Sequence, residues 1–366
     1  MEHRQLTLTG WTSPDGREFA LVLQTDGTAF VEVGPDGSLD YVGRLPTQTG
    51  NSLWRDSKVI GNFAYIGSEA SGHGLQIFDL TKLLVVKPFF KAPNPPKTFS
   101  VKTDLTALFD KFGNSHNIVA NVATNMIYAV GTGSQARCSG GLYMVDVSNP
   151  AKPVSPGCVS NDGYVHDAQC VVYSGVDTEF VGHEICFNYN EDTLTIVDIT
   201  DKKNPVQLSR TAYKGHAYTH QGWLTSADMK YLVLDDELDE MDGTVPDSFT
   251  RTYIFDVGDL TKPVHTGTYK GPALSIDHNQ YIKEGLSYQA NYRSGLRVVD
   301  VRSIPSDPTG GTMKQVGFFD CDPTDDKDTS GAVDFGGSWG VYPFFASGFV
   351  VLNSIERGLF SLKYTG

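Results

Sequence analysis

The chain has no long hydrophobic run, since its longest apolar stretches, such as FFASGFVVL, have the length of a single strand. A membrane-spanning helix needs about 18 or more apolar residues, so membrane insertion is not expected. Basic residues are also scarce: 29 Lys and Arg stand against 43 Asp and Glu, which gives a formal net charge of −14. Nucleic acids and anionic membrane surfaces bind to basic surfaces, so neither is an expected partner.

The sequence also has no recognisable signal peptide at its start and only one locally helical pattern. The N-terminal sequence MEHRQLTLTG lacks the apolar core of a signal peptide and has the pattern of a strand. Met1 is therefore expected to be either an added start on a mature protein or the start of an intracellular one. A locally helical pattern occurs at residues 103–112, TDLTALFDKF.

Cysteine is infrequent, with 5 residues in a chain of 366. We predict two disulfides within β units and one free thiol, at Cys321. The predicted pairs are Cys138 with Cys158, which flank a strand–turn–strand unit, and Cys170 with Cys186, on neighbouring predicted strands. Buried free thiols are the alternative, because 5 cysteines allow many connectivities. Disulfide-linked β units in an acidic, glycine-rich chain favour a secreted protein.

A short hydrophobic strand that ends in Asp recurs along the chain. The clearest copies are LQIFDL (75–80), LYMVDV (142–147), LTIVDI (194–199), YIFDV (253–257) and LRVVDV (296–301). A second apolar strand precedes each copy, and the β-branched and aromatic residues in both indicate strands. About seven units of roughly 50 residues, each with three or four strands, predict an all-β fold, a seven-bladed β-propeller. We expect it to form a single domain over residues 1–366.

The two ends of the chain suggest how such a propeller closes. The last unit ends after its third strand, GLFSLKY, and the chain begins with an unassigned strand, RQLTLTG. We expect the N-terminal strand to complete the final blade, because this would remove an exposed sheet edge.

Alignment of the seven units on the start of the innermost strand places His in four consecutive units and Trp in the other three. These residues, near which the blades are expected to begin, are Trp11, Trp54, His116, His166, His220, His278 and Trp339. In a propeller the innermost strands surround a central channel, so we expect these side chains to rim one mouth of it.

Four imidazoles at one mouth predict a metal site. Leaving them buried and unpaired would be costly, whereas a divalent metal such as Mn, Fe or Zn binds neutral imidazole. The predicted ligands are His116, His166, His220 and His278. Asp167, Asp277 and Gln221 lie nearby in the sequence and are available to support or supplement them. Two alternatives stay open: hydrogen bonds from each His to the neighbouring blade, and acid–base chemistry without metal.

Other residues on the predicted site face have roles in substrate binding and catalysis. The candidate bases are His166, His220 and Tyr292. The groups expected to hold a substrate carboxylate are Arg293 and Arg357. Salt bridges between loops are the alternative for both arginines. The three tryptophans either stack on a sugar or another flat ligand or plug the channel; they are Trp11, Trp54 and Trp339.

The acidic loop DDELDEMDG (235–243) is a candidate calcium site through Asp235, Asp236 and Glu237. A second acidic loop, DCDPTDDKD (320–328), is a weaker candidate. A solvated loop without calcium is the alternative in each case, since the spacing does not match an EF-hand.

Several longer runs resemble one known family. GYVHDAQCVVY, YTHQGWLT, NYRSGLRVVD and GSWGVYPFFASG are similar to segments of the LVIVD-repeat, choice-of-anchor B family, and the likeness extends from about Trp54 to the C-terminus. The resemblance implies a β-propeller that bacteria or fungi secrete or display. Many members carry an anchoring segment that this sequence lacks, so a freely secreted form is expected. The family implies no particular reaction.

Three functions therefore remain open. The preferred one is a secreted, monomeric, metal-dependent lyase or hydrolase that acts on a carbohydrate or another polar small molecule. The second is a non-catalytic propeller for adhesion or ligand binding. The third is a metal-free isomerase or cyclase that orients its substrate in a Trp-lined funnel.

Overall fold

The structure is a computed structural model that describes residues 5–85, 95–133, 137–323 and 333–366. Within these residues the strands form seven sheets of three to five strands. The chain divides into two compact units. Unit 1 comprises Met1–Tyr164, Tyr342–Asn353 and Gly358–Tyr364, and unit 2 comprises Val165–Val341, Ser354–Arg357 and Thr365–Gly366.

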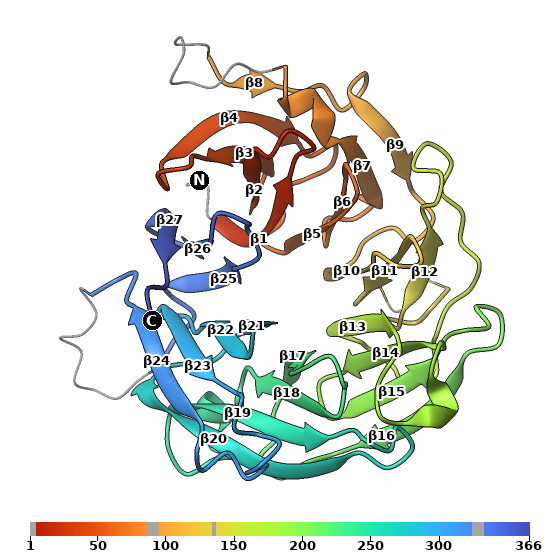
Figure 1. Ribbon diagram of the computed structural model, residues 1–366. Helices are drawn as coiled ribbons and strands as arrows, with labels where there is room; N and C mark the ends of the chain where they lie inside the picture. Colours follow the sequence, from red (N-terminus) through yellow and green to blue (C-terminus); the bar gives the residue numbers. More distant parts are fainter. Residues whose placement is uncertain (1–4, 86–94, 134–136, 324–332) are drawn as a thin grey trace. The chain divides into compact units, whose positions relative to one another are not determined.

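Three sheets belong to unit 1, and their strands are labelled in Figure 1. The first has the order β1 (Gln5–Thr12), β2 (Glu18–Gln24), β3 (Gly27–Val33), β4 (Leu39–Pro46) and β8 (Lys97–Thr98). The second has the order β5 (Arg55–Ile60), β6 (Phe63–Ser68), β7 (Leu75–Asp79) and β9 (Leu105–Phe109). The third has the order β10 (Asn117–Asn121), β11 (Met126–Val130) and β12 (Tyr143–Asp146).

Unit 2 also contains three sheets, each with four strands in sequence order. The first comprises β13 (Asp167–Val172), β14 (Glu184–Tyr189), β15 (Leu194–Asp198) and β16 (Val206–Thr211). The second comprises β17 (Thr219–Leu224), β18 (Tyr231–Asp236), β19 (Phe249–Asp256) and β20 (Val264–Leu274). The third comprises β21 (Asn279–Lys283), β22 (Leu286–Ala290), β23 (Leu296–Asp300) and β24 (Lys314–Phe319).

The last sheet has the order β25 (Ser338–Tyr342), β26 (Phe349–Ser354) and β27 (Gly358–Lys363). The helices in the described residues are short: η1 (Leu80–Leu83), η3 (Thr178–Phe180) and α1 (Asp239–Asp242). None of them has the length and hydropathy of a membrane-crossing segment.

The burial of the strands explains the repeated hydrophobic pattern. All six residues of β14 are buried, as are four of the five residues of β15, whereas no residue of the outer strand β16 is buried. A strand that is covered on both faces reads as a continuous apolar run, and a strand with a solvent face does not. The repeat LTIVD in β15 and its equivalents in β7, β19 and β23 are therefore inner strands of their sheets.

One prediction about a strand is not confirmed, and another is wrong. The N-terminal strand β1 pairs with β2 in the first sheet, so closure of the last sheet by this strand is not confirmed. Residues 105–109, expected within a helical segment, form strand β9, which pairs with β7. Pairing with β7 buries Phe109 in the hydrophobic core, and this tertiary contact outweighs the weak local helical pattern.

One of the two predicted disulfides is present. Cys170 on β13 lies directly opposite Cys186 on β14, and the two form a disulfide. Cys138 and Cys158 are free thiols, so the prediction of a second disulfide is wrong. Burial and the neighbouring Cys158 thiol raise the pKa of Cys138, which disfavours the thiolate that begins disulfide formation. Cys321 is free, as predicted.

Replacing both Cys170 and Cys186 with alanine is expected to lower the free energy of unfolding by about 3 kcal/mol, because the loop between these cysteines, with a sequence separation of 16, is no longer closed in the unfolded chain. Denaturant unfolding of the variant and of the wild type measures the difference. A Cys158→Ala variant, which removes a free thiol, is the control. Equal unfolding midpoints for the double variant and the wild type would contradict a stabilising disulfide.

Candidate metal centre

Three of the four predicted metal-binding histidines gather in unit 2, each at the start of the first strand of its sheet. His166 immediately precedes β13, His220 is the second residue of β17, and His278 immediately precedes β21. His220 occupies a shift in the register of β17 against β18, between Thr219 and Gln221. Such a bulge changes the direction of a side chain, and bulges are common beside functional sites.

The three imidazoles lie side by side. The ring centroids of His166 and His220 are 4.1 Å apart, and those of His220 and His278 are 4.5 Å apart. Their exposed fractions are between 2% and 3%, so the rings are shielded from solvent. Buried imidazoles this close together cannot all be protonated without strong repulsion, which favours neutral rings that can bind a metal.

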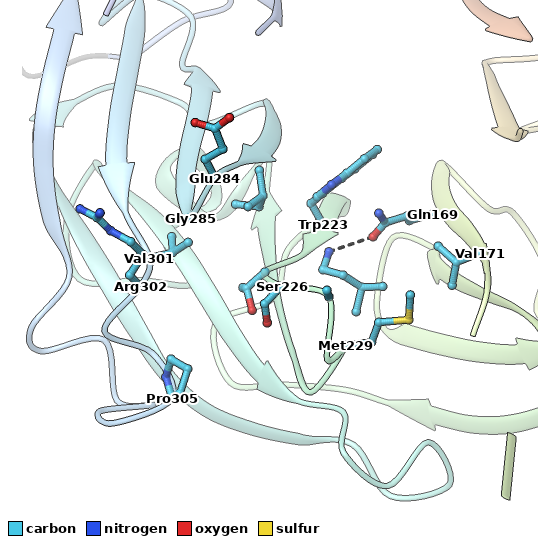
Figure 2. A pocket seen from close by; sticks show the side chains of 14 residues that line it. Gln169, Val171, Trp223, Ser226, Met229, Glu284, Gly285, Val301, Arg302 and Pro305 are labelled. Atoms are coloured by element: carbon cyan, nitrogen blue, oxygen red, sulfur yellow. Dashed lines mark hydrogen bonds between the residues drawn. The ribbon is translucent and has the colours of Figure 1, made fainter. Parts of the chain in front are cut away.

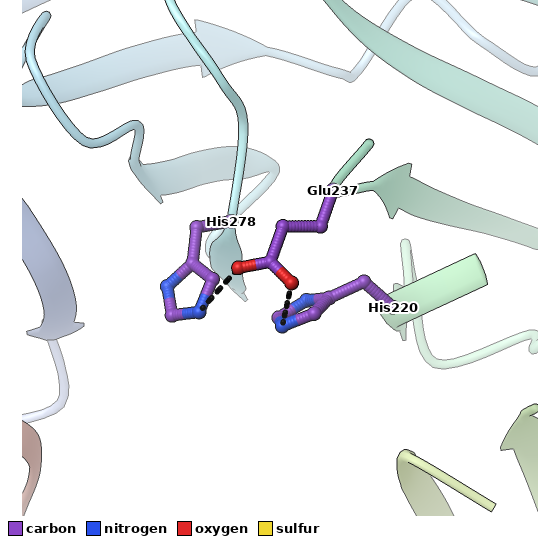
Figure 3. A group of neighbouring side chains, drawn as sticks. All are labelled: His220, Glu237 and His278. Atoms are coloured by element: carbon purple, nitrogen blue, oxygen red, sulfur yellow. Dashed lines mark ion pairs between the residues drawn. The ribbon is translucent and has the colours of Figure 1, made fainter. Parts of the chain in front are cut away.

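Glu237 completes the group. It directly follows β18, and its carboxylate lies between two of the imidazoles, as Figure 3 shows. Glu237 Oε2 is 3.9 Å from His220 Nε2, and Glu237 Oε1 is 3.5 Å from His278 Nε2. Among the residues that the structure describes, these three side chains can hold a metal ion together, since their ligand atoms all lie within 4.8 Å of one another.

The other ring nitrogen of each imidazole in this group is held by an acceptor. His220 Nδ1 donates to Asp235 Oδ1 at 3.1 Å, and His278 Nδ1 donates to the carbonyl of Trp339 at 2.6 Å. A proton on Nδ1 leaves the lone pair on Nε2, the atom that faces Glu237. Metal-binding histidines are usually oriented in this way, by a carboxylate or a backbone carbonyl.

His166 and His116 occupy different surroundings. His166 Nδ1 donates to the carbonyl of His220 at 2.8 Å, which ties the first strands of two sheets together. His116 belongs to unit 1, where its Nδ1 lies 2.6 Å from Glu69 Oε1. Neither is a member of the His220–Glu237–His278 group. A common site for all four histidines stays a prediction.

Tyr292 supports Glu237. Its hydroxyl donates to Glu237 Oε1 at 2.6 Å, and its backbone has a φ of 33°, a conformation that costs free energy in a residue other than glycine. Burial, followed by the charge of Glu237, raises the pKa of Tyr292 well above its usual value. Tyr292 is therefore a neutral donor that positions the carboxylate, and this contact does not favour the predicted role as a base.

The two arginines expected to bind a substrate carboxylate are paired with carboxylates of the protein. Arg293 Nε lies 2.9 Å from Asp334, and Arg357 Nη2 lies 2.7 Å from Asp322. These are the salt bridges between loops that formed the alternative, although the partners differ from the acidic residues expected.

The tryptophans separate into different environments. The ring of Trp339 lies 4.8 Å from that of His278, beside the metal-binding group. Trp54 precedes β5 and is 42% exposed. Trp11 lies at the end of β1 and not at its start, so its predicted register is wrong. It is buried against Phe19 in the hydrophobic core, because the first hairpin begins earlier than the alignment assumed.

The structure does not bring Asp235, Asp236 and Glu237 together as a calcium site. Asp235 accepts hydrogen bonds from Gln221, Gln280 and His220. Asp236, the next residue of the strand, points to the opposite face and accepts from the hydroxyl of Tyr213 at 2.6 Å. The three carboxylates thus serve different partners. Part of the second acidic loop, residues 324–328, lies outside the described residues.

Three more buried carboxyl groups are near Glu237 or His278 in the sequence: Asp239 and Glu240 on α1, and Asp277 immediately before His278. Burial raises the pKa of Asp239 to about 6. Burial, followed by the charges of Asp277 and Asp239, raises the pKa of Glu240. A carboxyl with a raised pKa in the folded state stabilises the fold below its unfolded pKa of about 4, and this stability is lost as the pH rises through the folded pKa.

Replacing Glu240 with glutamine is therefore expected to raise the melting temperature at about pH 8, with a smaller effect at about pH 5, because the buried carboxyl must take up a proton on folding at the higher pH whereas glutamine is neutral without one. Thermal unfolding of both proteins across this range measures the effect. Glu179→Gln, at an exposed position on η3, is the control. A Glu240→Gln variant that is less stable than the wild type at about pH 8 would show that the surrounding residues stabilise the Glu240 carboxyl group.

A cavity of about 610 Å³ lies at the far end of β17 from His220, around Trp223 and the following turn. Figure 2 shows its mixed lining, with apolar side chains such as Val171 and Met229 and the charged side chains of Glu284 and Arg302. Gln169 Oε1 accepts from the backbone N–H of Leu224 at its edge, at 2.8 Å. Ligand pockets often have this size and composition. The sequence pattern did not predict this cavity.

Comparison with known proteins supports the fold. A solved structure of the β-propeller domain of Cps50 (Swd1) from Myceliophteria thermophila matches with a TM-score of 0.53 and 10% identity, covering 99% of this chain and 96% of that one. The computationally designed Ika8 protein matches with a TM-score of 0.50 and 9% identity, covering 100% and 97%. Comparison with the curated proteins gives no significant match.

The seven sheets and these likenesses define the chain as an all-β protein of the seven-bladed β-propeller class, as predicted. Residues 136–160 match the model of the LVIVD repeat. The matched repeat and the seven-sheet fold fit an LVIVD-repeat β-propeller family, in agreement with the resemblance seen in the sequence.

Proposed function

We propose that the chain is a metal-dependent lyase or hydrolase in which His220, Glu237 and His278 bind a divalent metal. One observation carries the proposal: two buried imidazoles present Nε2 to the same carboxylate, while an acceptor fixes the Nδ1 proton of each. Histidines without a metal do not require both contacts, whereas metal-binding histidines regularly have an acceptor at the ring nitrogen that does not bind the metal.

The donor set fits several metals. Two His and one Glu form catalytic zinc sites, and two His with one carboxylate also bind Fe(II). Mn, Fe and Zn therefore remain the candidates. Three protein ligands leave coordination positions for water or substrate, and a bound divalent metal can activate water or stabilise the anion formed when an α-proton is removed.

The surrounding residues have definite roles in this proposal. Tyr292 holds Glu237 in place, and Asp235 and the Trp339 carbonyl orient the imidazoles. His166, with its ring 4.1 Å from that of His220, is the candidate general base. Trp339 borders the group through His278 and offers an aromatic face for a sugar ring.

The substrate and the location of the protein belong to the same proposal. A carbohydrate or another polar small molecule suits a metal centre beside an aromatic ring. The Cys170–Cys186 disulfide supports a secreted protein, since disulfides persist in oxidising compartments. We further propose that the protein acts as a monomer.

Metal analysis of the purified protein tests the proposal directly. Protein stripped with a chelator and then dialysed against Mn²⁺, Fe²⁺ or Zn²⁺ is expected to bind about one equivalent per chain, measured by elemental analysis. Bound metal without turnover of polysaccharides or small polar substrates would favour a binding or adhesion protein. Absence of stoichiometric binding by all three metals would rule out the metalloenzyme and leave the metal-free enzyme and the non-catalytic binding protein.

The Asp235→Asn variant tests how much the side chain that orients His220 contributes to metal affinity. The variant is expected to lower metal affinity by about 10- to 100-fold, because the amide replaces one of the two side-chain oxygens that accept from His220, Gln221 and Gln280 and so no longer fixes the Nδ1 proton of His220. Titration calorimetry with Zn²⁺ measures the affinity. Asp192→Asn, at an exposed residue that pairs with Arg210, is the control. Unchanged affinity in Asp235→Asn would show that His220 is not a ligand oriented by this carboxylate.

A further inference from the structure

Unit 1 contains a buried cation, Arg55, whose guanidinium makes no hydrogen bond to a carboxylate in the described residues; the charge of Asp26 acts on it, but Asp26 pairs with Arg44. Arg55 is the first residue of β5, and its side chain is 1% exposed. In the part of the chain that the structure describes, Nε, Nη1 and Nη2 of its guanidinium all lack a hydrogen-bond partner. An arginine stays protonated in proteins, so this is a buried charge whose donors are unsatisfied.

Neighbouring strands place other unpartnered polar atoms on the sheet faces that meet in the same aromatic core. Arg55 and Ser57 share a face of β5 with Val59, which packs into the aromatic core between the first two sheets. Thr28 on β3 and Gln76 on β7 each lie two residues before a phenylalanine of that core, Phe30 and Phe78. Thr28 Oγ1, Ser57 Oγ and Gln76 Oε1 are buried without a hydrogen-bond partner.

His73 also belongs to this surrounding. It is fully buried, its Nδ1 donates to the carbonyl of Gly74 at 2.9 Å, and its Nε2 has no hydrogen-bond partner. Burial, followed by the charge of Arg55, lowers the pKa of His73 to about 3, so its ring is neutral beside the guanidinium. We call Arg55, Thr28, Ser57, His73 and Gln76 the Arg55 cluster.

The guanidinium of Arg55 and the hydroxyl groups of Thr28 and Ser57 are complementary to an anion. In contrast, Gln76 Oε1 and Nε2 of the neutral His73 are acceptors that pair only with a protonated oxygen of the ligand. Burying an isolated charge costs several kcal/mol unless a partner of opposite sign and hydrogen bonds compensate it. The planar guanidinium matches the two oxygens of a carboxylate or a phosphate, and the hydroxyl groups of Thr28 and Ser57 can donate to further oxygens. The chain has a net charge of −14, so its overall electrostatic potential repels anions. The affinity of this cluster for an anion therefore comes from local contacts.

We propose that the Arg55 cluster binds a small oxyanion, a carboxylate or phosphate, between the first two sheets of unit 1. The cluster is separate from the His220–Glu237–His278 group, whose residues all belong to unit 2. The proposal therefore does not depend on metal binding.

Thermal unfolding of the full chain tests whether the Arg55 cluster binds an oxyanion. The chain is unfolded in chloride-free buffer to which acetate, phosphate or chloride is added at equal ionic strength. Acetate or phosphate is expected to raise the melting temperature saturably, by roughly 3 °C or more, through binding to the folded state. The Arg55→Met variant is expected to lose this shift, and Arg210→Met, at an exposed arginine, to retain it. Whichever oxyanion saturates at the lower concentration identifies the preferred class.

Two results would overturn the proposal. One is an equal rise with chloride and with both oxyanions, because a bidentate oxyanion site discriminates against chloride. The other is a shift that persists in Arg55→Met. If that variant does not fold, NMR of the wild type with ³¹P-phosphate and ¹³C-acetate decides: saturable line broadening supports the site, and unbroadened lines for both anions refute it.

Discussion

Replacing Glu237 with glutamine is expected to lower metal affinity by about 100-fold or more, since the loss of a direct ligand should exceed the 10- to 100-fold cost of losing a group that orients one. The amide oxygen of the new side chain can still accept the hydrogen bond that Tyr292 donates to Glu237. The fold should therefore persist while the charged ligand is lost. Elemental analysis after dialysis against Zn²⁺ or Mn²⁺ measures the retained metal.

The control for this change is Glu179→Gln, at an exposed position of unit 2. It removes the same charge from the chain, so a general effect of charge on cation binding would appear in both variants. Metal content equal to that of the wild type in Glu237→Gln would contradict the proposed ligand set. A loss in both variants would point to nonspecific binding by an acidic protein.

Replacing Phe78 with alanine is expected to lower the free energy of unfolding by about 3–5 kcal/mol. Phe78 is fully buried in unit 1, with its ring 5.2 Å from that of Phe30 and 4.9 Å from that of Phe99. Truncation removes these contacts and leaves a cavity between two sheets, which a β-sheet framework cannot readily close. Denaturant unfolding measures the change.

Phe318→Ala is the matched control for the core substitution. Phe318 is 66% exposed, and its ring lies 5.1 Å from the guanidinium carbon of Arg297. Its removal is expected to cost less than about 1 kcal/mol, the usual size of an exposed cation–π contact. If both variants unfolded at the same denaturant concentration, the aromatic core would not stabilise unit 1 as its packing indicates.

The predictions that succeeded depended on local patterns. Most of the repeats that end in Asp, such as LTIVD, are inner strands of their sheets because burial on both faces demands a continuous apolar run. The Cys170–Cys186 pair was predictable because the two residues lie on strands that are adjacent in sequence. His166, His220 and His278 were found by their equivalent places at the starts of strands.

The predictions that failed depended on register and on contacts distant in sequence. The position of Trp11 was misjudged because the first hairpin has a different length before its turn, and no local signal marks that difference. Glu237 was assigned to a calcium loop because it stands among other acidic residues. Its position immediately after β18, on a loop at the same sheet end as His220, was the available signal.

The sequence by itself determined the all-β repeat, its count of seven units and the alignment of three histidines, because strand burial and strand order impose periodic patterns on the chain. The tertiary structure alone decided which groups meet those histidines. His220 and His278 are 58 residues apart and face one carboxylate because the first strands of their sheets, β17 and β21, lie against each other and His220 occupies a bulge of β17. Sequence spacing does not encode the direction in which a bulge turns a side chain.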